Sequence, residues 1–338
     1  MGRVCIPSTQ QQIQSSTTSQ ARKCLQRNGT SRNHLSHGCT DKLLPGDPDV
    51  GCVTQSAGTP TRVQVASMPT EEASLSAPDP GAGTPSPTPG KSLGLGLAAR
   101  PTSLRGADLH RTTGTDGSSL TVHLLFFDQS CFDPEDFAAT GISCPANIAR
   151  SVRKRQAEFL FGRLAARLTL NDVAPTTSAA EVAIGPTREP IWPPGIIGSI
   201  SHCDRVAAAI AEPQGTRRGI GIDLERVASA KTCEALLTTV VDDKETALLR
   251  QLAGERWPIE TLLTLVFSAK ESLFKGAFPV VGRYFHFSAA QLVALDQERR
   301  LLRFSLTETL CDEFRQAQCV DIGFDFIEPD LPLTHFVW

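Results

Sequence analysis

The alternation of apolar and polar positions predicts ordered structure only in the C-terminal part of the chain. The segment Ser119–Asp128 has strand composition and is expected to open the folded domain. In Ile148–Leu170, apolar residues recur every three to four positions, which predicts a long helix whose other face is rich in arginine. Further strands are predicted at Ile196–His202, Arg205–Glu212 and Gly219–Glu225, the first two forming a hairpin.

The pattern after Glu225 predicts helices and then a run of strands. Helical periodicity covers Cys233–Leu252, with a new helix beginning at Asp242-Asp243, and continues over Ile259–Ala277. The strand-like stretches that follow are Tyr284–Phe287, Leu301–Leu306, Cys319–Ile327 and His335–Trp338. Because these strands follow one another without helices between them, we expect an α+β fold with mainly antiparallel sheet.

Residues 1–118 differ in composition from the rest of the chain. They contain no Phe, Trp or Tyr and are rich in Ser, Thr, Gly, Pro and Gln, as in the run Ala77–Pro89. Such a segment cannot bury enough apolar surface to offset the entropy of ordering it. We therefore predict a disordered tail over 1–118 and a folded domain over 119–338. The first 40 residues also contain no Asp or Glu and several Arg, which is typical of an organelle transit peptide. An upstream extension from a misplaced start codon is the alternative.

The sequence offers no membrane span, signal peptide or cysteine-based metal site. It has no run of about 18 apolar residues, and its N-terminus lacks the apolar core of a secretory signal. The ten cysteines are scattered without a Cys-x-x-Cys pair, and the formal net charge of −3 comes with no basic stripe. We expect a cytoplasmic protein that binds no nucleic acid and does not insert stably into a membrane.

Two carboxylate motifs about 45 residues apart carry the candidate chemistry. In Gly-Ile-Asp-Leu-Glu, Asp223 and Glu225 are two positions apart, so both carboxylates project from one face of a strand. In Lys-Glu-Ser-Leu-Phe-Lys, Glu271 and Lys275 lie one turn apart on the same side of a helix. Three carboxylates and a lysine predict a Mg²⁺–phosphate site, because a hard cation takes oxygen ligands and shares them with phosphate.

Five short motifs occur in order along the folded region. They are Lys154–Arg163, Arg188–Pro193, Gly198–His202, Gly221–Glu225 and Phe267–Lys275. Together they resemble the motifs of the 4′-phosphopantetheinyl transferases of the surfactin and enterobactin type, and the resemblance covers roughly Leu120–Trp338. The Glu-Phe-Leu-x-Gly-Arg and Arg-x-Pro-x-Trp-Pro motifs are similar to those of the enterobactin-type branch.

The resemblance implies a fold, a reaction and partners. The fold would be a pseudo-dimer of two similar α+β halves, about 119–213 and 214–338, with coenzyme A in a cleft between them. The reaction would be Mg²⁺-dependent: the phosphopantetheine arm of coenzyme A moves to a serine of an apo acyl or peptidyl carrier protein, and adenosine 3′,5′-bisphosphate leaves. Such carriers serve fatty-acid, polyketide, nonribosomal-peptide or siderophore synthesis, and we expect a monomeric enzyme.

The resemblance also implies roles for the residues of the two carboxylate motifs. Asp223, Glu225 and Glu271 would ligate Mg²⁺, and Glu271 could instead be the base that takes the proton of the carrier serine. Lys275 would stabilise negative charge at the α-phosphate, so Asp223 and Lys275 both belong to the coenzyme site. We expect Lys270 to form a structural ion pair.

The other motifs would hold the phosphates of coenzyme A. Ser201 and His202 would bind them at the end of a strand. Arginine forks match phosphate oxygens, and the candidates around the 3′-phosphate are Arg155, Arg163 and Arg188. Glu189 stands where surfactin-type relatives carry a lysine, so Arg188 is expected to take over that contact.

Other interpretations use parts of the same pattern. A Mg²⁺-dependent phosphatase or nuclease would need further acidic ligands or a nucleophilic aspartate motif, and neither is apparent. A non-catalytic carrier-binding module would have lost acidic groups that this chain retains. Each motif alone could also be ordinary structure: a polar strand edge, a surface Glu–Lys pair, or a solvated basic helix face.

Overall fold

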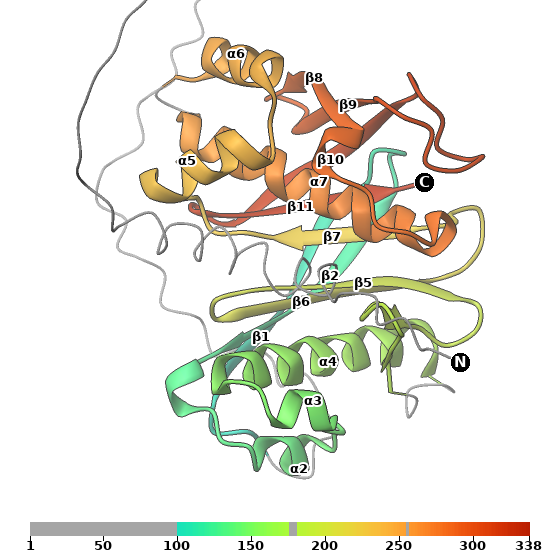
Figure 1. The fold of residues 1–338 in the computed structure, drawn as a ribbon. Coiled ribbons are helices and arrows are strands. Elements are labelled where there is room, and N and C mark those ends of the chain that lie inside the picture. Colours follow the sequence, from blue (N-terminus) through green and yellow to red (C-terminus); the bar gives the residue numbers. More distant parts are fainter. Residues whose placement is uncertain (1–99, 176–180, 255–256) are drawn as a thin grey trace, which may run out of the picture. The chain divides into compact units, whose positions relative to one another are not determined.

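The computed structural model describes residues 100–175, 181–254 and 257–338. These ranges form two antiparallel sheets, each with a long helix packed on one face, and a separate two-stranded hairpin (Figure 1). The expectation of mixed helix and antiparallel sheet is confirmed for these residues. The part of the predicted disordered tail that covers residues 1–99 lies outside the described residues.

The first sheet has the strand order β1-β2-β6-β5 and is covered by helix α4. Its elements are β1 (Leu104–Thr113), β2 (Ser119–Phe127), α4 (Arg153–Val173), β5 (Ile196–Cys203) and β6 (Val206–Pro213). Strand β2 has apolar residues on both faces: Leu125 and Phe127 pack under α4, whereas Val122 and Leu124 face the second sheet. The sheet is therefore buried on both sides.

Short elements complete this half of the described chain. They are η1 (Gln129–Cys131), α2 (Asp136–Thr140), α3 (Ala146–Ala149) and the hairpin of β3 (Ala183–Ile184) and β4 (Pro190–Ile191). The β3–β4 hairpin falls largely within the proline-rich segment that carries the Arg-x-Pro-x-Trp-Pro motif.

The second sheet has the strand order β7-β11-β10-β9-β8. Its elements are β7 (Ile220–Leu224), α5 (Ala230–Thr239), α6 (Asp243–Leu252), α7 (Ile259–Val281), η3 (Phe287–Ala289), β8 (Ala290–Asp296), β9 (Leu301–Leu306), β10 (Cys319–Glu328) and β11 (Leu331–Val337). The predicted new helix at Asp242 is confirmed, because a capping box of Asp242 and Glu245 begins α6. Helix α7 lies against β7 and β11 (Figure 1).

Gly221 of β7 and Gly276 of α7 allow the helix to approach the strand closely. A Cβ on Gly221 would lie only 2.0 Å from the carbonyl oxygen of Ser272 and 2.6 Å from the backbone nitrogen of Gly276. No side chain fits there, so the first residue of the Gly-Ile-Asp-Leu-Glu motif is a packing requirement. The close approach brings the middle of α7, with Glu271 and Lys275, next to the end of β7.

Helix α7 is also anchored by a buried ion pair. Lys270 Nζ lies 2.8 Å from Glu245 Oε1 and donates to the carbonyl of Val240 at 2.8 Å. The expected structural role of Lys270 is confirmed. Because Glu245 also belongs to the capping box of α6, this ion pair ties α6 to α7.

The two sheets meet through an apolar cluster and two serine hydroxyls. The cluster is formed by Leu120, Val122, Leu124, Val206, Ala208 and Ile210 of the first sheet and Ile220, Ile222, Leu224, Leu331, Leu333 and Val337 of the second. Strands β5 and β7 contact each other there. Ser199 Oγ accepts from the backbone nitrogen of Ile222 at 3.0 Å, and Ser201 Oγ accepts from that of Leu224 at 3.1 Å. Side-chain oxygens thus satisfy backbone donors at the junction.

Two predictions about elements are wrong. The boundary of the disordered tail at residue 118 is too late, because β1 pairs with β2 from Leu104↔Phe127 to Thr113↔Ser119. Strand β1 is a polar edge strand that takes its apolar contacts from its partner, so its own composition gives little signal. Tyr284–Phe287 is not a strand: Tyr284 and Phe285 pack on Phe274 of α7, and the strand begins only at Ala290.

No helix in the described ranges is both long enough and apolar enough to cross a membrane.

Candidate active site

Asp223 is the centre of the cluster that the structure brings together at the end of β7. Its side chain is buried, with the residue 4 % exposed. Oδ1 lies 2.6 Å from Lys275 Nζ and accepts from Ser201 Oγ at 2.9 Å. Oδ2 is buried and has no hydrogen-bond partner. The carboxylate is thus fixed through one oxygen, while the other keeps its capacity to bind a donor or cation.

Lys275 contacts residues of two different strands, Ser201 of β5 and both Ile222 and Asp223 of β7. Its ammonium, on α7, also donates to the carbonyl of Ile222 at 3.1 Å and to Ser201 Oγ at 3.2 Å. The side chain is 26 % exposed, so the ammonium remains within reach of a ligand. Ser201 therefore connects β5 of the first sheet to both Asp223 and Lys275 of the second.

Glu271 and Glu225 add two carboxyl groups with perturbed pKa values. Burial raises the pKa of Glu271 to about 7, and the charge of Asp223 contributes in the same direction while Lys275 opposes it. Burial also raises the pKa of Glu225 well above its ordinary value, with the charges of Asp223 and Glu271 adding to the effect. The three acidic groups repel one another, and Lys275 supplies only one compensating positive charge.

This donor set fits a hard divalent cation. Oxygen ligands, excess negative charge and the unpartnered Oδ2 of Asp223 are the features that such an ion requires. Within the ranges that the structure describes, no three His, Cys, Asp or Glu side chains are already arranged as a metal-binding group. The assignment of Asp223, Glu225 and Glu271 as metal ligands stays a prediction.

His202 points to a different partner from its neighbour Ser201. Arg155 Nη1 lies 2.9 Å from His202 Nε2, and because a guanidinium only donates, Nε2 is the acceptor. Burial lowers the pKa of His202 to about 3, and the charges of Arg155 and Lys275 add to the effect. The imidazole is therefore neutral, with Nδ1 left to carry its proton toward Glu158 Oε2 at 3.7 Å.

Arg163 and Arg188 are placed along the β3–β4 hairpin. Arg163 Nη2 donates to the carbonyl of Ala183 at 3.3 Å, and its guanidinium lies 5.0 Å from the centre of the Phe159 ring. Burial and the charge of Arg155 lower the pKa of Arg163 to about 10. Arg188 is exposed on the turn between the two hairpin strands. The structure thus joins Arg163 to the hairpin and Arg155 to His202, whereas Ser201, Asp223 and Lys275 are in direct mutual contact.

Two family models match adjacent parts of this region. The model of the 4′-phosphopantetheinyl transferase N-terminal domain matches residues 145–212, and that of the 4′-phosphopantetheinyl transferase superfamily matches residues 219–323. Enterobactin synthase component D of Escherichia coli (strain K12) is 35 % identical over 157 residues, which are 46 % of this chain and 70 % of that protein. The chain belongs to the 4′-phosphopantetheinyl transferase superfamily.

Other members of the superfamily have a similar sequence identity to this chain. Enterobactin synthase component D of Salmonella typhi is 36 % identical over 154 residues, covering 46 % of this chain and 61 % of the relative. The 4′-phosphopantetheinyl transferase Npt of Nocardia iowensis is 34 % identical over 162 residues, covering 47 % and 68 %. The chain therefore spans about three fifths of the Salmonella relative that it matches. The enterobactin-type resemblance of the motifs is confirmed by these relatives.

Sequence reasoning missed two contacts of this superfamily member. Ser201 was assigned to phosphate alone, yet it also holds Asp223 and Lys275 in place. Tyr284 was assigned to a strand, yet its hydroxyl donates to the carbonyl of Thr187 at 2.8 Å. The aromatic residues that follow the Lys-Glu motif along the chain are a sequence signal that favours packing of Tyr284 on this helix.

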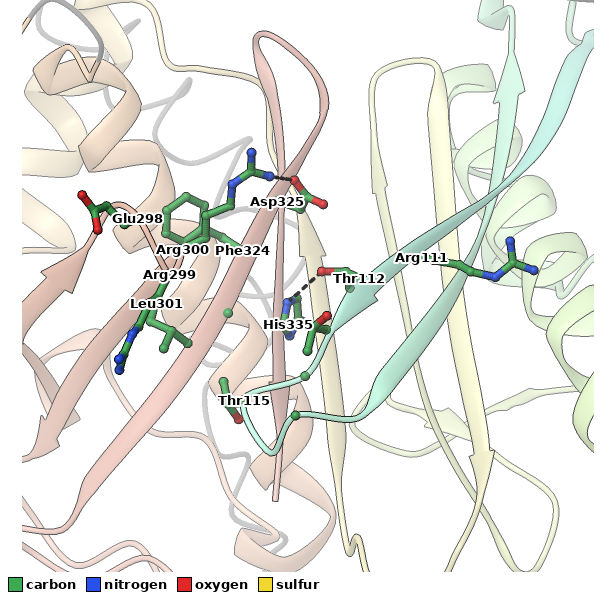
Figure 2. A pocket seen from close by; sticks show the side chains of 14 residues that line it. Arg111, Thr112, Thr115, Glu298, Arg299, Arg300, Leu301, Phe324, Asp325 and His335 are labelled. Atoms are coloured by element: carbon green, nitrogen blue, oxygen red, sulfur yellow. Dashed lines mark hydrogen bonds and ion pairs between the residues drawn. The ribbon is translucent and has the colours of Figure 1, made fainter. Parts of the chain in front are cut away.

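A hollow of the described chain lies away from this cluster, and none of the predicted site residues lines it. This cleft of about 450 Å³ is lined by the end of β1 and the β1–β2 turn, by the β8–β9 turn and the start of β9, and by residues of β10 and β11. The lining includes Thr112, Arg300, Asp325 and His335 (Figure 2). His335 pairs with Ile222 in the sheet, so its side chain projects from the face opposite Asp223. We assign the superfamily's chemistry to the Asp223 cluster because the carboxylates and the lysine are there.

Proposed function

We propose that this chain transfers the 4′-phosphopantetheine group of coenzyme A to a serine of an apo carrier protein and releases adenosine 3′,5′-bisphosphate. The observation that carries the proposal is the contact of Ser201, Asp223 and Lys275 across β5, β7 and α7, beside two carboxyl groups of raised pKa. Family membership supports the same reaction.

Coenzyme A would lie between the two halves of a pseudo-dimer. Two sheets that each carry one long helix and meet at β5 and β7 support this arrangement. The first half offers Arg155, the neutral His202 and, along the hairpin, Arg163 and Arg188. These groups suit the phosphates at the nucleotide end of the coenzyme, because guanidinium forks pair with phosphate oxygens and a neutral imidazole can donate one hydrogen bond.

Lys275 would act on the pyrophosphate of the coenzyme. Its ammonium is held by the Ile222 carbonyl, by Ser201 and by Asp223, so it is pre-oriented before the substrate arrives. A fixed positive charge at the position where negative charge develops lowers the barrier without reorganisation at the moment of reaction. Ser201 would share this task by orienting both Lys275 and Asp223.

Asp223, Glu225 and Glu271 would hold a divalent cation such as Mg²⁺. When bound, that ion would neutralise charge on the leaving phosphate. Asp223 would bind through Oδ2, the oxygen without a partner in the protein. Burial, together with the negative charge of neighbouring carboxylates, raises the pKa values of Glu225 and Glu271, and an added positive charge would offset both effects.

Glu271 is the residue we propose as the general base. The charges of Asp223 and Lys275 act on its carboxyl group, so it belongs to the same cluster, and a serine hydroxyl needs a nearby base to become a good nucleophile. In the step itself, the carrier serine oxygen forms a bond to the β-phosphorus of coenzyme A, and the bond from that phosphorus to the bridging oxygen breaks. The serine proton passes to Glu271, and adenosine 3′,5′-bisphosphate takes the bond electrons.

The partner would be a carrier protein of fatty-acid, polyketide, nonribosomal-peptide or siderophore synthesis. Relatives named as enterobactin synthase components make a siderophore carrier the first one to test. We further propose that the enzyme is monomeric and acts in the cytoplasm, where coenzyme A and apo carriers meet.

Incubation of the purified chain with Mg²⁺, coenzyme A and a panel of apo carriers tests the proposal. Intact mass spectrometry should show that the mass of at least one carrier rises by one phosphopantetheine group. A carrier whose acceptor serine is replaced by alanine should keep its mass. If no carrier in a panel drawn from all four pathways gains mass, the transferase proposal is wrong.

A further inference from the structure

Tyr284 links the two halves of the described chain through a hydrogen bond that does not involve the carboxylate cluster. It is the only tyrosine in the sequence and lies two residues after Gly282, the C-cap of α7. Its hydroxyl donates to the carbonyl of Thr187 at 2.8 Å, a contact across 97 positions of sequence. Thr187 belongs to the turn of the β3–β4 hairpin, so this hydrogen bond joins the hairpin to the loop after α7.

The ring of Tyr284 packs against aromatic side chains of helix α7. It stacks on Phe274 with centroids 5.5 Å apart and planes at 16°, and it lies 5.7 Å from the ring of Phe278. Phe274 immediately precedes Lys275 on α7. The position of the phenol is therefore set by the same helix that carries Lys275 and Glu271.

The turn that Tyr284 holds has a strained centre. Arg188 has φ 75°, in the left-handed region that is unfavourable for a residue with a side chain. The carboxylate of Glu189 accepts from the backbone nitrogen of Thr187 at 2.9 Å and also contacts the Thr187 hydroxyl. The nitrogen of Arg188 donates to Gly185 at 3.0 Å. Such a conformation persists only where surrounding contacts enforce it, and the Tyr284 bond is one of them.

The local charges keep the Tyr284 hydroxyl a donor. Burial raises the pKa of the phenol, the charge of Glu189 adds to this, and Arg188 opposes it. The phenol is therefore protonated at neutral pH and donates to the Thr187 carbonyl throughout the working range.

We propose that Tyr284 is a positioning residue whose hydroxyl sets the Thr187–Glu189 turn, and with it Arg188, for the 3′-phosphate of coenzyme A. The inference rests on the proposed transferase function and extends it. It links the nucleotide end of the coenzyme to the helix that carries Lys275, through one hydrogen bond and one aromatic stack.

Replacement of Tyr284 by phenylalanine tests the proposal, since it keeps the ring and removes only the donor. Loss of one such hydrogen bond should raise the KM for coenzyme A about 3- to 10-fold, with kcat within about 2-fold of the wild-type value. Dephospho-coenzyme A lacks the 3′-phosphate, so wild type and Tyr284→Phe should use it with the same KM. Purely structural damage would affect both substrates alike.

Two further variants sharpen the comparison. Thr307→Val is the control, because it also removes a hydrogen bond from a side-chain hydroxyl to a backbone carbonyl in the same half, from Thr307 Oγ1 to Ser288 at 2.6 Å. It should leave the KM values for coenzyme A and dephospho-coenzyme A unchanged. Arg188→Gln should raise the KM for coenzyme A, and its combination with Tyr284→Phe should be clearly less than multiplicative, because both changes act through one contact.

A spectroscopic measurement gives an answer that does not depend on turnover. Because Tyr284 is the only tyrosine, protein made with 3-fluorotyrosine should show one ¹⁹F resonance. Coenzyme A should shift that resonance, and dephospho-coenzyme A should shift it less. Absence of carrier modification by the wild type would refute the transferase function, whereas an active wild type with unchanged KM in Tyr284→Phe, or equal ¹⁹F responses to the two coenzymes, would overturn the role of Tyr284 alone.

Discussion

The two halves of the described chain share a design, a long helix on an antiparallel sheet, but they present opposite chemistry. The first half carries mainly cationic groups toward the proposed coenzyme, with Arg155 at His202 and Arg163 at the β3–β4 hairpin. The second half carries the carboxylates and Lys275 at β7 and α7. Neither half contains all the residues of the proposed site. We propose that the first half binds the phosphates of the coenzyme and that the second half performs the transfer.

Helix packing explains part of this contrast. Gly221 lets α7 lie almost against the backbone of β7, so short carboxylate side chains on the strand and the helix reach one another. On the first sheet, a Cβ on Gly162 of α4 would meet only the side chain of Ile200, at 3.1 Å. The groups that α4 provides to the candidate site are long arginine side chains, which contact His202 and the carbonyl of Ala183.

The largest expected effect comes from removing the centre of the acidic half. Asp223→Asn should lower kcat by about 10²- to 10³-fold or more, on the scale of losing one preorganised charge-stabilising group, because Lys275 loses its anchoring carboxylate. Carrier mass spectrometry over time measures the rate. Asp321→Asn, which breaks an exposed pair with Arg303, should leave the rate unchanged. A full rate in Asp223→Asn with Mg²⁺ would remove Asp223 from the site.

Removal of the single positive charge of the second half should have the next largest effect. Lys275→Ala should lower kcat by roughly 10²-fold, since a donor aimed at developing charge is lost. Lys244→Ala on the exposed face of α6 serves as control and should retain the wild-type rate. A variant that changes only the thermal midpoint would show that Lys275 makes an ordinary structural ion pair.

The raised pKa of Glu271 predicts how the acidic half responds to pH in metal-free protein. With a folded pKa of about 7 against an ordinary 4.5, the folded state holds the proton more tightly than the unfolded state does. Its contribution to stability is therefore complete below about pH 4.5 and is lost as pH rises toward 7. Glu271→Gln should raise the melting temperature by several degrees at pH 8 in EDTA and by little at pH 4.5.

The control for that measurement is Glu234→Gln on the exposed face of α5, which should shift the melting temperature equally little at both pH values. An equal gain for Glu271→Gln at both pH values would contradict the proposed burial of its charge.

The smallest expected effect comes from replacing the two serines at the junction of the halves, only one of which also belongs to the proposed site. Ser199 and Ser201 each accept one backbone hydrogen bond from β7, but only Ser201 also contacts Asp223 and Lys275. Both alanine variants should lose about 1–3 kcal/mol of stability, because each leaves a buried donor unpaired. Only Ser201→Ala should also lower kcat. Equal kinetic effects would mean that the serines act only as structural acceptors.

The sequence predicted elements well where burial imposes a clear period. Helix α7 and strand β7 were predicted because Gly221–Glu225 and Ile259–Ala277 have strong apolar patterns, and the Glu271–Lys275 spacing follows from helix geometry. Strand β1 was missed because an edge strand can be polar on its own and still be ordered by its neighbour.

The residues of the site were easier to name than the contacts between them. Asp223 and Lys275 came from short motifs, but their contact with Ser201 depends on how two sheets meet, which no local pattern encodes. The bond from Tyr284 to Thr187 has the same origin. Contacts between distant segments arise from tertiary packing, so they became visible only in the fold.

The apolar cluster between the sheets has a consequence for how this chain could be divided or recombined. Each sheet on its own would expose a continuous apolar face, with Leu120, Val122 and Leu124 on one and Ile222, Leu333 and Val337 on the other. A chain cut in the connection between β6 and β7 should therefore give two insoluble fragments that recover structure when they are produced together. Natural exchange of one half for that of a distant homologue would face the same constraint, so the halves are expected to evolve as a matched pair.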